Sequence, residues 1–158
     1  MRKEQLDNWI KNGGKLPENL TGNEERYLMD LGWEESREWY NNGQLKWEDN
    51  YLHGKKHGVH RLWYHNGQLD YEENFLNGKQ QGTHRSWHHN GKLWWEKNFL
   101  NGKNHGVRRS WTDDGQPVLE RSYIHGKLHG VQRSWTDDGE LLEHEEYAYG
   151  VFLRDHLK

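Results

Sequence analysis

The chain has 158 residues, the length of one ordinary domain, but only 31% of them are hydrophobic, which excludes a thick three-dimensional core. Ten tryptophans and eight tyrosines exclude a disordered chain, because disordered chains are poor in aromatic residues. The net charge of -3 provides no overall basic surface, so nucleic acid is not an expected partner.

The sequence contains no cysteine, which excludes disulfide bonds and thiolate chemistry and is consistent with a reducing compartment. Its start, Met-Arg-Lys-Glu-Gln, has no apolar run typical of a signal peptide, and no stretch is long and apolar enough to span a bilayer. We therefore expect a soluble cytoplasmic protein or, for a viral protein, one located in the host cytoplasm or the virion.

Residues 1–38 predict two short helices. Leu6, Trp9 and Ile10 recur at helical spacing, and the glycine pair that follows them is typical of a helix end. A second helix is expected from about Asn23 to Leu31. Because an open sheet edge presents unpaired backbone groups, we expect these helices to cover the first exposed strand of the following array. The alternative is a separate recruiting module.

From Trp39 onward the sequence repeats every 24 residues, which is typical of a repeat architecture. The period is marked by Trp39, Trp63, Trp87, Trp111 and Trp135. We therefore assign residues 1–38 to a helical N-terminal cap and residues 39–158 to a repeat array. The repeats are expected near residues 39–62, 63–86, 87–110, 111–134 and 135–158.

Fourteen of the eighteen glycines fall in three columns of the repeat. The columns that begin at Gly43 and Gly54 separate alternating segments, as hairpin turns do. Each repeat is thus predicted to contain two strands and two turns. The predicted fold is an all-β repeat, an elongated, twisted antiparallel sheet of successive β-hairpins. The third column begins at Gly58 within a strand, where a missing side chain gives an aromatic ring room to cross the backbone.

The alternation of side chains predicts the register. If all apolar side chains share one face, both turns must be three-residue loops, Leu52-His53-Gly54 and His65-Asn66-Gly67, in bulged type I turns. The predicted face then carries four columns of apolar side chains. They are Leu45, Leu69 and Leu93; Trp47, Tyr71, Trp95 and Leu119; Tyr51, Phe75, Phe99, Tyr123 and Tyr147; and Trp63, Trp87, Trp111 and Trp135.

The pattern Trp/Tyr-x-Asn-Gly-Gln-Leu-x-x-Glu-x-Asn-Tyr-x-Asn-Gly-Lys-x-His-Gly, over residues 39 to about 150, resembles a MORN repeat. It is similar to the variant common in bacterial proteins, including a MORN-type antitoxin family. The resemblance implies antiparallel hairpins that contact proteins or lipids and lack catalytic activity. Pro117 departs from the pattern, and His144 stands where the other copies have glutamate. Phe152 and Leu153 are expected to fold over the last sheet edge.

The histidines and glutamates are the candidate residues for a metal site or a catalytic site. His57, His105 and His129 share a column, but equivalent residues in successive repeats lie about 9–10 Å apart, too far to share a metal ion. We expect structural histidines and neither a metal nor another cofactor. The glutamate column recurs regularly rather than as one pair in a cleft, which favours cross-strand salt bridges over acid–base catalysis. No enzyme is expected. The column is Glu48, Glu72, Glu96 and Glu120.

Two basic rows are candidate binding sites. The arginines are predicted on the apolar face, near enough to stack on rings, as structural braces or as an anion-binding ladder. The lysines follow one set of turns, as solvated residues or as a basic edge for anionic lipid or an acidic partner. The arginines are Arg61, Arg85, Arg109 and Arg133, and the lysines are Lys55, Lys79, Lys103 and Lys127.

We expect a non-enzymatic scaffold for protein–protein interaction. Its candidate binding residues are Trp47, Tyr71 and Trp95 together with the four arginines. One alternative is an antitoxin that neutralises a partner toxin, and another is peripheral binding to anionic phospholipid through the lysines. Another protein is the expected partner, and an exposed terminal strand is also suited to pairing two copies into a homodimer.

Overall fold

The computed structural model describes residues 2–158, which form two compact units, residues 2–81 (unit 1) and residues 82–158 (unit 2). Unit 1 contains α1 (Lys3–Asn12), α2 (Gly22–Asp30), β1 (Trp33–Trp39), β2 (Leu45–Leu52), β3 (Lys55–Lys56), β4 (Gly58–Trp63), β5 (Leu69–Leu76) and β6 (Lys79–Gln80). Unit 2 contains β7 (Gly82–Trp87), β8 (Leu93–Leu100), β9 (Lys103–Asn104), β10 (Gly106–Trp111), β11 (Pro117–Ile124), β12 (Lys127–Leu128), β13 (Gly130–Trp135), β14 (Leu141–Ala148) and β15 (Val151–Asp155).

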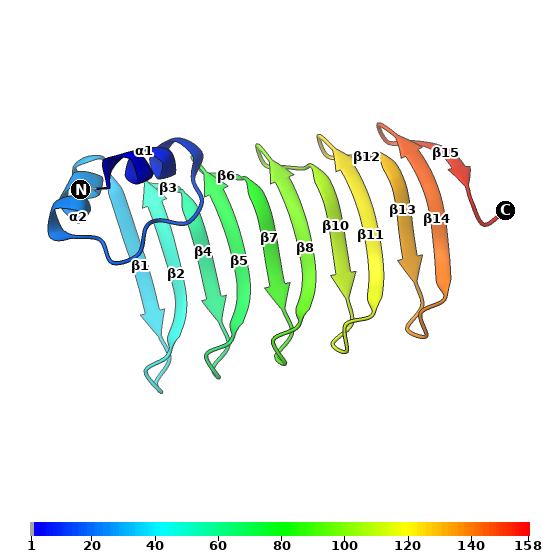
Figure 1. The fold of residues 1–158 in the computed structure, drawn as a ribbon, viewed down its shortest axis with the longest axis horizontal. Coiled ribbons are helices and arrows are strands. Elements are labelled where there is room, and N and C mark those ends of the chain that lie inside the picture. The colour runs from blue at the N-terminus through cyan, green and yellow to red at the C-terminus, as the bar shows by residue number, and fades with distance from the viewer. Residues whose placement is uncertain (1) are drawn as a thin grey trace. The chain divides into compact units, whose positions relative to one another are not determined.

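Each unit contains an antiparallel sheet of successive hairpins (Figure 1). The order in unit 1 is β1-β2-β4-β5, with β3 paired to β2 and β6 to β5. The order in unit 2 is β7-β8-β10-β11-β13-β14-β15, with β9 paired to β8 and β12 to β11. The predicted fold class, an all-β array of β-hairpins with a short helical N-terminal cap, is confirmed.

Both predicted helices are present. α1 ends at Gly13, whose positive φ of 71° suits glycine and whose N–H bonds the Trp9 carbonyl. α2 begins after Thr21, which forms a capping box with Glu24. β1 was not predicted, because all of it except Trp39 precedes the repeat pattern.

The helices lie on one face of the unit 1 sheet. α2 contacts β1, whereas α1 lies near β3 at one end of the strands (Figure 1). A Cβ on Gly58 would meet the Trp9 indole nitrogen at 2.5 Å, and the Gly14 N–H bonds the Asn74 side chain at 3.0 Å. At Gly58 the absent side chain does admit an aromatic ring, as expected, but the ring comes from α1. The helices therefore extend well beyond the first strand.

One of the two predicted turns is confirmed and the other is wrong. His65-Asn66-Gly67 is a three-residue loop, with Tyr64 N–H bonded to the Gln68 carbonyl and a φ of 83° at Gly67. The other turn is a two-residue loop, in which His53 has a φ of 52° and Gly54 a φ of 70°. Two consecutive left-handed residues form a type I′ turn, which matches the right-handed twist of the strands. Asn77, Asn101, His125 and Tyr149 begin equivalent turns.

The two-residue turn changes which side chains share a face. Trp47 lies opposite Leu62, and Glu48 lies opposite Arg61, so Trp47 and Arg61 point to opposite faces. The single apolar face with its four columns is therefore wrong. The prediction assumed that one face holds every apolar side chain, and this assumption fails where both faces of a sheet are largely open to solvent.

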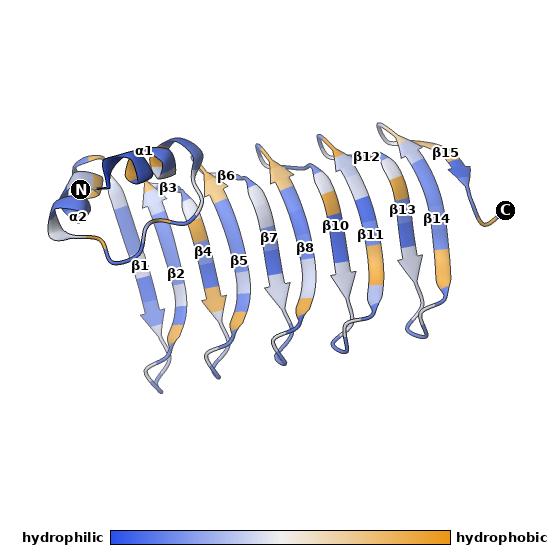
Figure 2. Ribbon diagram, in the orientation of Figure 1, coloured by the Kyte–Doolittle hydropathy of each residue, from blue (hydrophilic) through white to orange (hydrophobic). Residues whose placement is uncertain are grey.

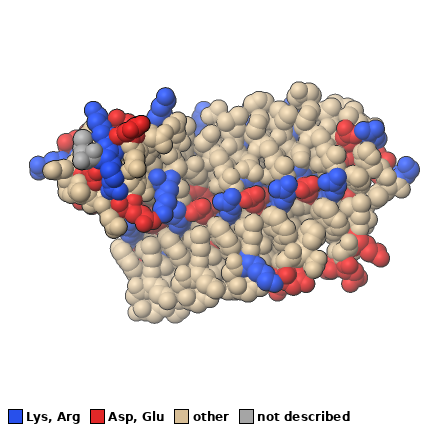
Figure 3. Space-filling view, in the orientation of Figure 1, with Lys and Arg blue, Asp and Glu red and all other residues tan. Residues whose placement is uncertain are grey.

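One face of each sheet carries alternating arginines and glutamates, and we call it the ladder face. In unit 1, Arg61 bonds Glu48 and Glu72, each at 2.8 Å. In unit 2, Arg109 and Arg133 bond Glu120 at 2.8 Å and 3.0 Å. Figure 3 shows this alternation of positive and negative residues within each unit. The expected cross-strand salt bridges of the glutamate column are thus present.

The hydrophobic core is small and lies at the cap. Leu6, Trp9, Leu28, Trp33 and Leu52 are the buried hydrophobic residues of the described chain, and all belong to unit 1. In residues 82–158 the buried side chains are polar, namely His84, Ser86 and Gln132. Figure 2 shows hydrophobic segments interrupted by hydrophilic ones along the strands. Strand pairing and polar contacts therefore carry much of the stability in unit 2.

The C-terminal segment continues the sheet of unit 2. β15 pairs with β14, and Phe152 lies opposite Tyr147, with the ring centroids 5.6 Å apart. Phe152 and Leu153 remain 51% and 54% exposed. The prediction that these residues fold over the last edge is wrong, because the two-residue turn before β15 directs the chain back alongside β14.

Arg61→Ala is expected to destabilise unit 1, because Glu48 and Glu72 each lose a half-buried, charge-assisted hydrogen bond. The free energy of unfolding should fall by about 1.5–3 kcal/mol. Denaturant unfolding followed by circular dichroism measures this change. Arg154→Ala is the matched control, because Arg154 is 64% exposed and its solvent-screened ion pair with Glu146 should contribute little to stability. Equal losses in the two variants would contradict a structural role for the ladder.

Candidate functional site

The face opposite the ladder, which we call the aromatic face, carries an apolar row in unit 1. Leu62 lies between Trp47 and Tyr71, because the register pairs it with both residues. Leu62 is 42% exposed, whereas the two rings are half-buried. The helices and their contacts with Asn74 and Val59 lie on the other face. The structure thus brings two predicted binding residues, Trp47 and Tyr71, to one open surface.

Both rings are held at one edge by a carboxylate. The Trp47 indole N–H donates to Glu38 at 2.7 Å, and Lys46 bonds the other oxygen of Glu38 at 2.7 Å. The Tyr71 hydroxyl donates to Glu73 at 2.9 Å. Burial and the Glu73 carboxylate raise the pKa of Tyr71, so this hydroxyl stays protonated and remains a donor. The rings are therefore positioned in advance.

The third predicted aromatic residue, Trp95, belongs to unit 2. It lies opposite Ser86 on one side and Ser110 on the other, where unit 1 has the larger Leu62. The Lys97 ammonium stands over the Trp95 ring at 4.2 Å from its centroid, a cation–π distance. Trp95 is thus covered in part by a cation rather than extended by an apolar neighbour.

The predicted arginines do not share a face with Trp47, Tyr71 and Trp95. Arg61, Arg85 and Arg109 each bond a glutamate on a neighbouring strand at 2.8 Å, and Arg133 bonds Glu120 at 3.0 Å. The prediction that they stack on the tryptophan rows of the candidate site is wrong, because the two-residue turns reverse the register. Their charges are compensated within the sheet, which indicates structural braces.

The four predicted lysines are exposed, and each follows a two-residue turn. Their stems run beside the glycine of the next turn: a Cβ on Gly78 would lie 3.6 Å from the Lys55 Cβ, and one on Gly150 would lie 3.8 Å from the Lys127 Cβ. These are ordinary contact distances, so the positive φ of 82° at Gly78 and 90° at Gly150, rather than the lysine, accounts for glycine at the turn. The geometry leaves the ammonium groups in solvent.

The histidine column connects successive turns. His57 accepts a hydrogen bond at Nδ1 from the Asn77 N–H, and its Nε2 lies 2.9 Å from the Trp9 carbonyl. His105 and His129 accept equivalent bonds from backbone N–H groups one repeat further along. Among residues 2–158, no group of three or more His, Cys, Asp or Glu residues is arranged to hold a metal ion. The column makes structural hydrogen bonds.

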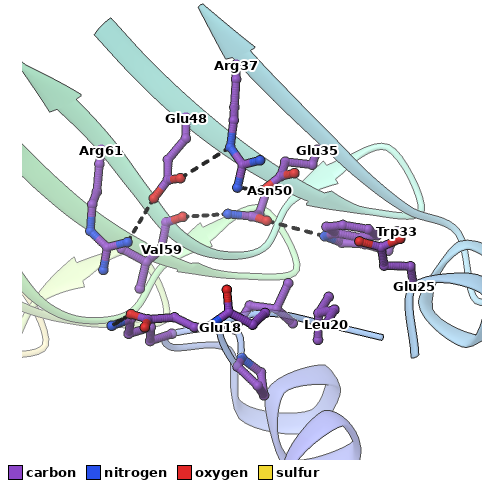
Figure 4. Close-up of a pocket in the computed structure, with 14 residues that line it drawn as sticks. Glu18, Leu20, Glu25, Trp33, Glu35, Arg37, Glu48, Asn50, Val59 and Arg61 are labelled. Carbon is purple, nitrogen blue, oxygen red and sulfur yellow. Dashed lines mark hydrogen bonds and ion pairs between the residues drawn. The ribbon is translucent and has the colours of Figure 1, made fainter. Parts of the chain in front are cut away.

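A polar cavity of about 460 Å³ lies in unit 1 between the segment that links the helices and the ladder face. Figure 4 shows Arg37 and Arg61 on either side of Glu48, with Asn50 bonded to the Val59 carbonyl and to Trp33. Burial raises the pKa of Glu35, which pairs with Arg37 in the same cavity. Because these arginines already have carboxylate partners, the cavity offers no uncompensated positive charge to a ligand.

One group of charged residues was missed by the sequence analysis. Lys97, Arg108 and Arg121 lie on adjacent strands of the aromatic face in unit 2, where Arg108 is directly opposite Arg121. Lys97 and Arg121 stand 24 residues apart at one position of the repeat, whereas Arg108 stands at another, so no single column contains all three. Only a correct hairpin register brings them together.

His60 is buried beneath the aromatic face of unit 1. Its Nδ1 lies 2.6 Å from Asp49, whereas its Nε2 has no hydrogen-bond partner among the described residues. Burial lowers the pKa of His60 more than Asp49 raises it. The folded protein therefore holds His60 in its neutral form.

The His60 contribution to stability should be present above the pKa of an unfolded histidine, about 6.5, and should be lost as the pH falls below it. The sign follows because the unfolded chain binds the proton more tightly than the folded chain. His60→Gln, which introduces the residue at the equivalent position Gln132, should show a smaller loss of stability between pH 7 and pH 5. Chemical denaturation at both pH values measures the difference, and an equal or larger loss in the variant would contradict it.

Comparison with known families agrees with this geometry. The family model described as MORN repeat variant matches residues 56–77, 80–101 and 128–149. Each segment includes one hairpin with a three-residue turn: β4–β5, β7–β8 and β13–β14. The copy with Pro117 lies outside these segments although it forms the equivalent hairpin, β10–β11.

No curated protein matches the chain. Among residues 2–158, no helix is long and apolar enough to cross a membrane. MORN repeats commonly act as modules for interaction with proteins or membranes, and the family is not known for catalysis. From its hairpins, its turn residues and the three matched segments, the chain belongs to the MORN-repeat proteins, with repeats of the variant type.

Proposed function

We propose that this chain is a non-catalytic protein-interaction scaffold that binds its partner through the aromatic face of unit 1. The observation that carries this proposal is the row Trp47–Leu62–Tyr71, in which an aliphatic side chain that is 42% exposed lies between two aromatic rings. Interface hot spots are enriched in tryptophan and tyrosine at their centre.

The surroundings of the row also suit a protein partner. Glu38 and Glu73 anchor the two rings, so little side-chain entropy is lost when a partner covers them. These carboxylates and Lys46 place polar groups around the apolar row, which resembles the polar rim of a protein–protein interface. An apolar centre with a polar border is a surface for reversible association.

Leu62→Ser tests the proposal, because serine occupies the equivalent positions Ser86, Ser110 and Ser134 and should preserve the fold. Affinity capture from the native host should recover a partner with the wild-type chain and at least about tenfold less of it with the variant, as expected for loss of a buried leucine contact. Circular dichroism checks that the variant is folded.

Ser110→Ala, a small change on the same face of unit 2, is the control and should retain the partner. Trp47→Ala should reduce capture further, because it removes one of the two rings. A partner retained by both Leu62→Ser and Trp47→Ala would contradict the proposed surface.

An antitoxin is a special case of this function, in which the captured partner is a toxin. Peripheral binding to anionic phospholipid is the alternative that the exposed lysines favour. Lys103→Gln and Lys127→Gln together should then abolish sedimentation with phosphatidylserine vesicles at low salt. Capture that depends on Leu62 while sedimentation is absent would favour the protein scaffold.

A homodimer is a second candidate assembly, favoured by the terminal strand β15. Val151, Phe152 and Leu153 are each more than half exposed on a strand that pairs only with β14 in the described chain. Such an edge offers both free backbone groups and apolar side chains to another strand. Phe152→Lys should shift a dimer to monomer in analytical ultracentrifugation, and a monomeric wild type would contradict this assembly.

A further inference from the structure

The aromatic face of unit 2 carries three cations in a row. Arg108 on β10 lies directly opposite Arg121 on β11. The register that pairs Ser110 with Trp95 and Arg109 with Glu96 also brings Arg108 to Lys97 on β8. Like charges directly opposite each other on adjacent strands are destabilising. The fold therefore holds these three residues together at a cost in stability.

The charge of this row is only partly compensated. Arg121 bonds Glu143 at 2.5 Å, and Lys97 stands over the Trp95 ring. Arg108 has no ion pair in the described chain, and its Nε is buried without a hydrogen-bond partner. Burial and the charge of Arg108 lower the pKa of Lys97. The neighbouring Arg109, on the ladder face, has a carboxylate at 2.8 Å. The arginine that lacks a counterion thus lies on the aromatic face, whereas its neighbour on the ladder face is paired.

Other copies of the repeat do not share the row. The position of Arg108 is occupied by His60, which bonds Asp49, and by Gln132, which bonds the Ser122 backbone. Lys97 and Arg121 share one repeat position, which is occupied by acidic residues in the other copies, namely Asp49, Glu73 and Glu145. A structural requirement of the repeat therefore does not explain the three cations.

We propose that the row formed by Lys97, Arg108 and Arg121 binds an acidic segment of a partner protein, whose carboxylates supply the missing counterions. This inference rests on the proposed function as a protein scaffold and names the chemistry of a second contact. The cations lie on adjacent strands, about 4.8 Å apart. Carboxylates three and four residues apart on a helix are separated by about 5–6 Å, so one helical face is suited to meet successive cations.

The surroundings of the row favour a protein segment over a membrane. Trp95, Phe99 and Tyr123 stand two residues from the cations on the same strands and therefore on the same face, where they offer apolar contact. Glu143 and Glu145 also lie on this face, opposite Ser134 and Gln132. Glu143 is already paired with Arg121, but the Glu145 carboxylate, two strands from Arg121, would repel the flat surface of an anionic membrane, whereas a segment laid along the row does not extend to it.

The probe is a fluorescein-labelled, alanine-based 20-residue peptide with glutamate at every third or fourth position, titrated with the full chain and followed by fluorescence anisotropy at low salt. The same peptide with glutamine in place of glutamate is the control ligand. The wild-type chain should bind only the glutamate peptide, and the affinity should fall as salt is added. Arg108→Gln should weaken binding at least about tenfold, as expected for loss of a charge-assisted contact.

Lys92→Gln is the matched control variant, because it removes one positive charge from an exposed position at the β7–β8 loop of the same unit and should leave the affinity unchanged. Arg108→Gln should also retain or raise the melting temperature, because it removes a like-charge contact, whereas a purely structural role would lower it. The NMR signal of the Arg108 Nε–H, identified by its absence in Arg108→Gln, should shift during the titration.

Equal affinities of the wild type and Arg108→Gln, or no binding of the glutamate peptide, would overturn the inference. Binding of phosphatidylserine vesicles that depends on Arg108, without binding of the peptide, would also overturn it and assign the row to a membrane. These outcomes are distinct from failure of the proposed function, because capture through Leu62 does not involve residues of the row.

Discussion

Pairs of consecutive left-handed residues, such as His53–Gly54, decide on which face of the sheet each side chain lies. The two-residue turn pairs Trp47 with Leu62 and Glu48 with Arg61. A three-residue turn would shift the register, and each of these residues would then lie opposite a different residue on the neighbouring strand. Because side chains alternate along a strand, this one choice separates the arginines from the aromatic row. The ladder face and the aromatic face both depend on it.

The ladder face explains how so polar a chain forms a stable sheet. Within each unit, arginines bridge glutamates on neighbouring strands, and half-burial strengthens these charge-assisted bonds relative to exposed pairs. The hydrophobic core, by contrast, is confined to the helices and the first strands, around Trp9 and Leu52. Each hairpin therefore derives much of its stability from its immediate neighbours, as in other repeat proteins.

The aromatic face is less regular than the ladder face, and this irregularity is where binding is proposed. In unit 1 an exposed leucine extends two anchored rings into an apolar row. In unit 2 the equivalent positions are serines, and three cations lie beside Trp95. A repeat protein is suited to this division, because one face maintains the strand pairing while substitutions on the other face alter recognition.

The sequence alone determined the period, the hairpins and both helices, because turn glycines, alternation and helix ends are local signals within a few residues of one another. The loop His65-Asn66-Gly67 was predicted for the same reason, and the salt-bridged glutamate column follows from its regular spacing. The strand β1 was missed because its residues before Trp39 lie outside the repeat pattern.

Tertiary structure alone decided which residues share a face. The sequence around His53–Gly54 is compatible with a two-residue or a three-residue turn, and a shift of one residue reverses every side chain. With apolar groups on both faces, hydrophobicity could not choose between them. The exposure of Leu62 and the meeting of Arg108 with Arg121 therefore became visible only from the paired strands, since the pairing decides which columns of the repeat face each other.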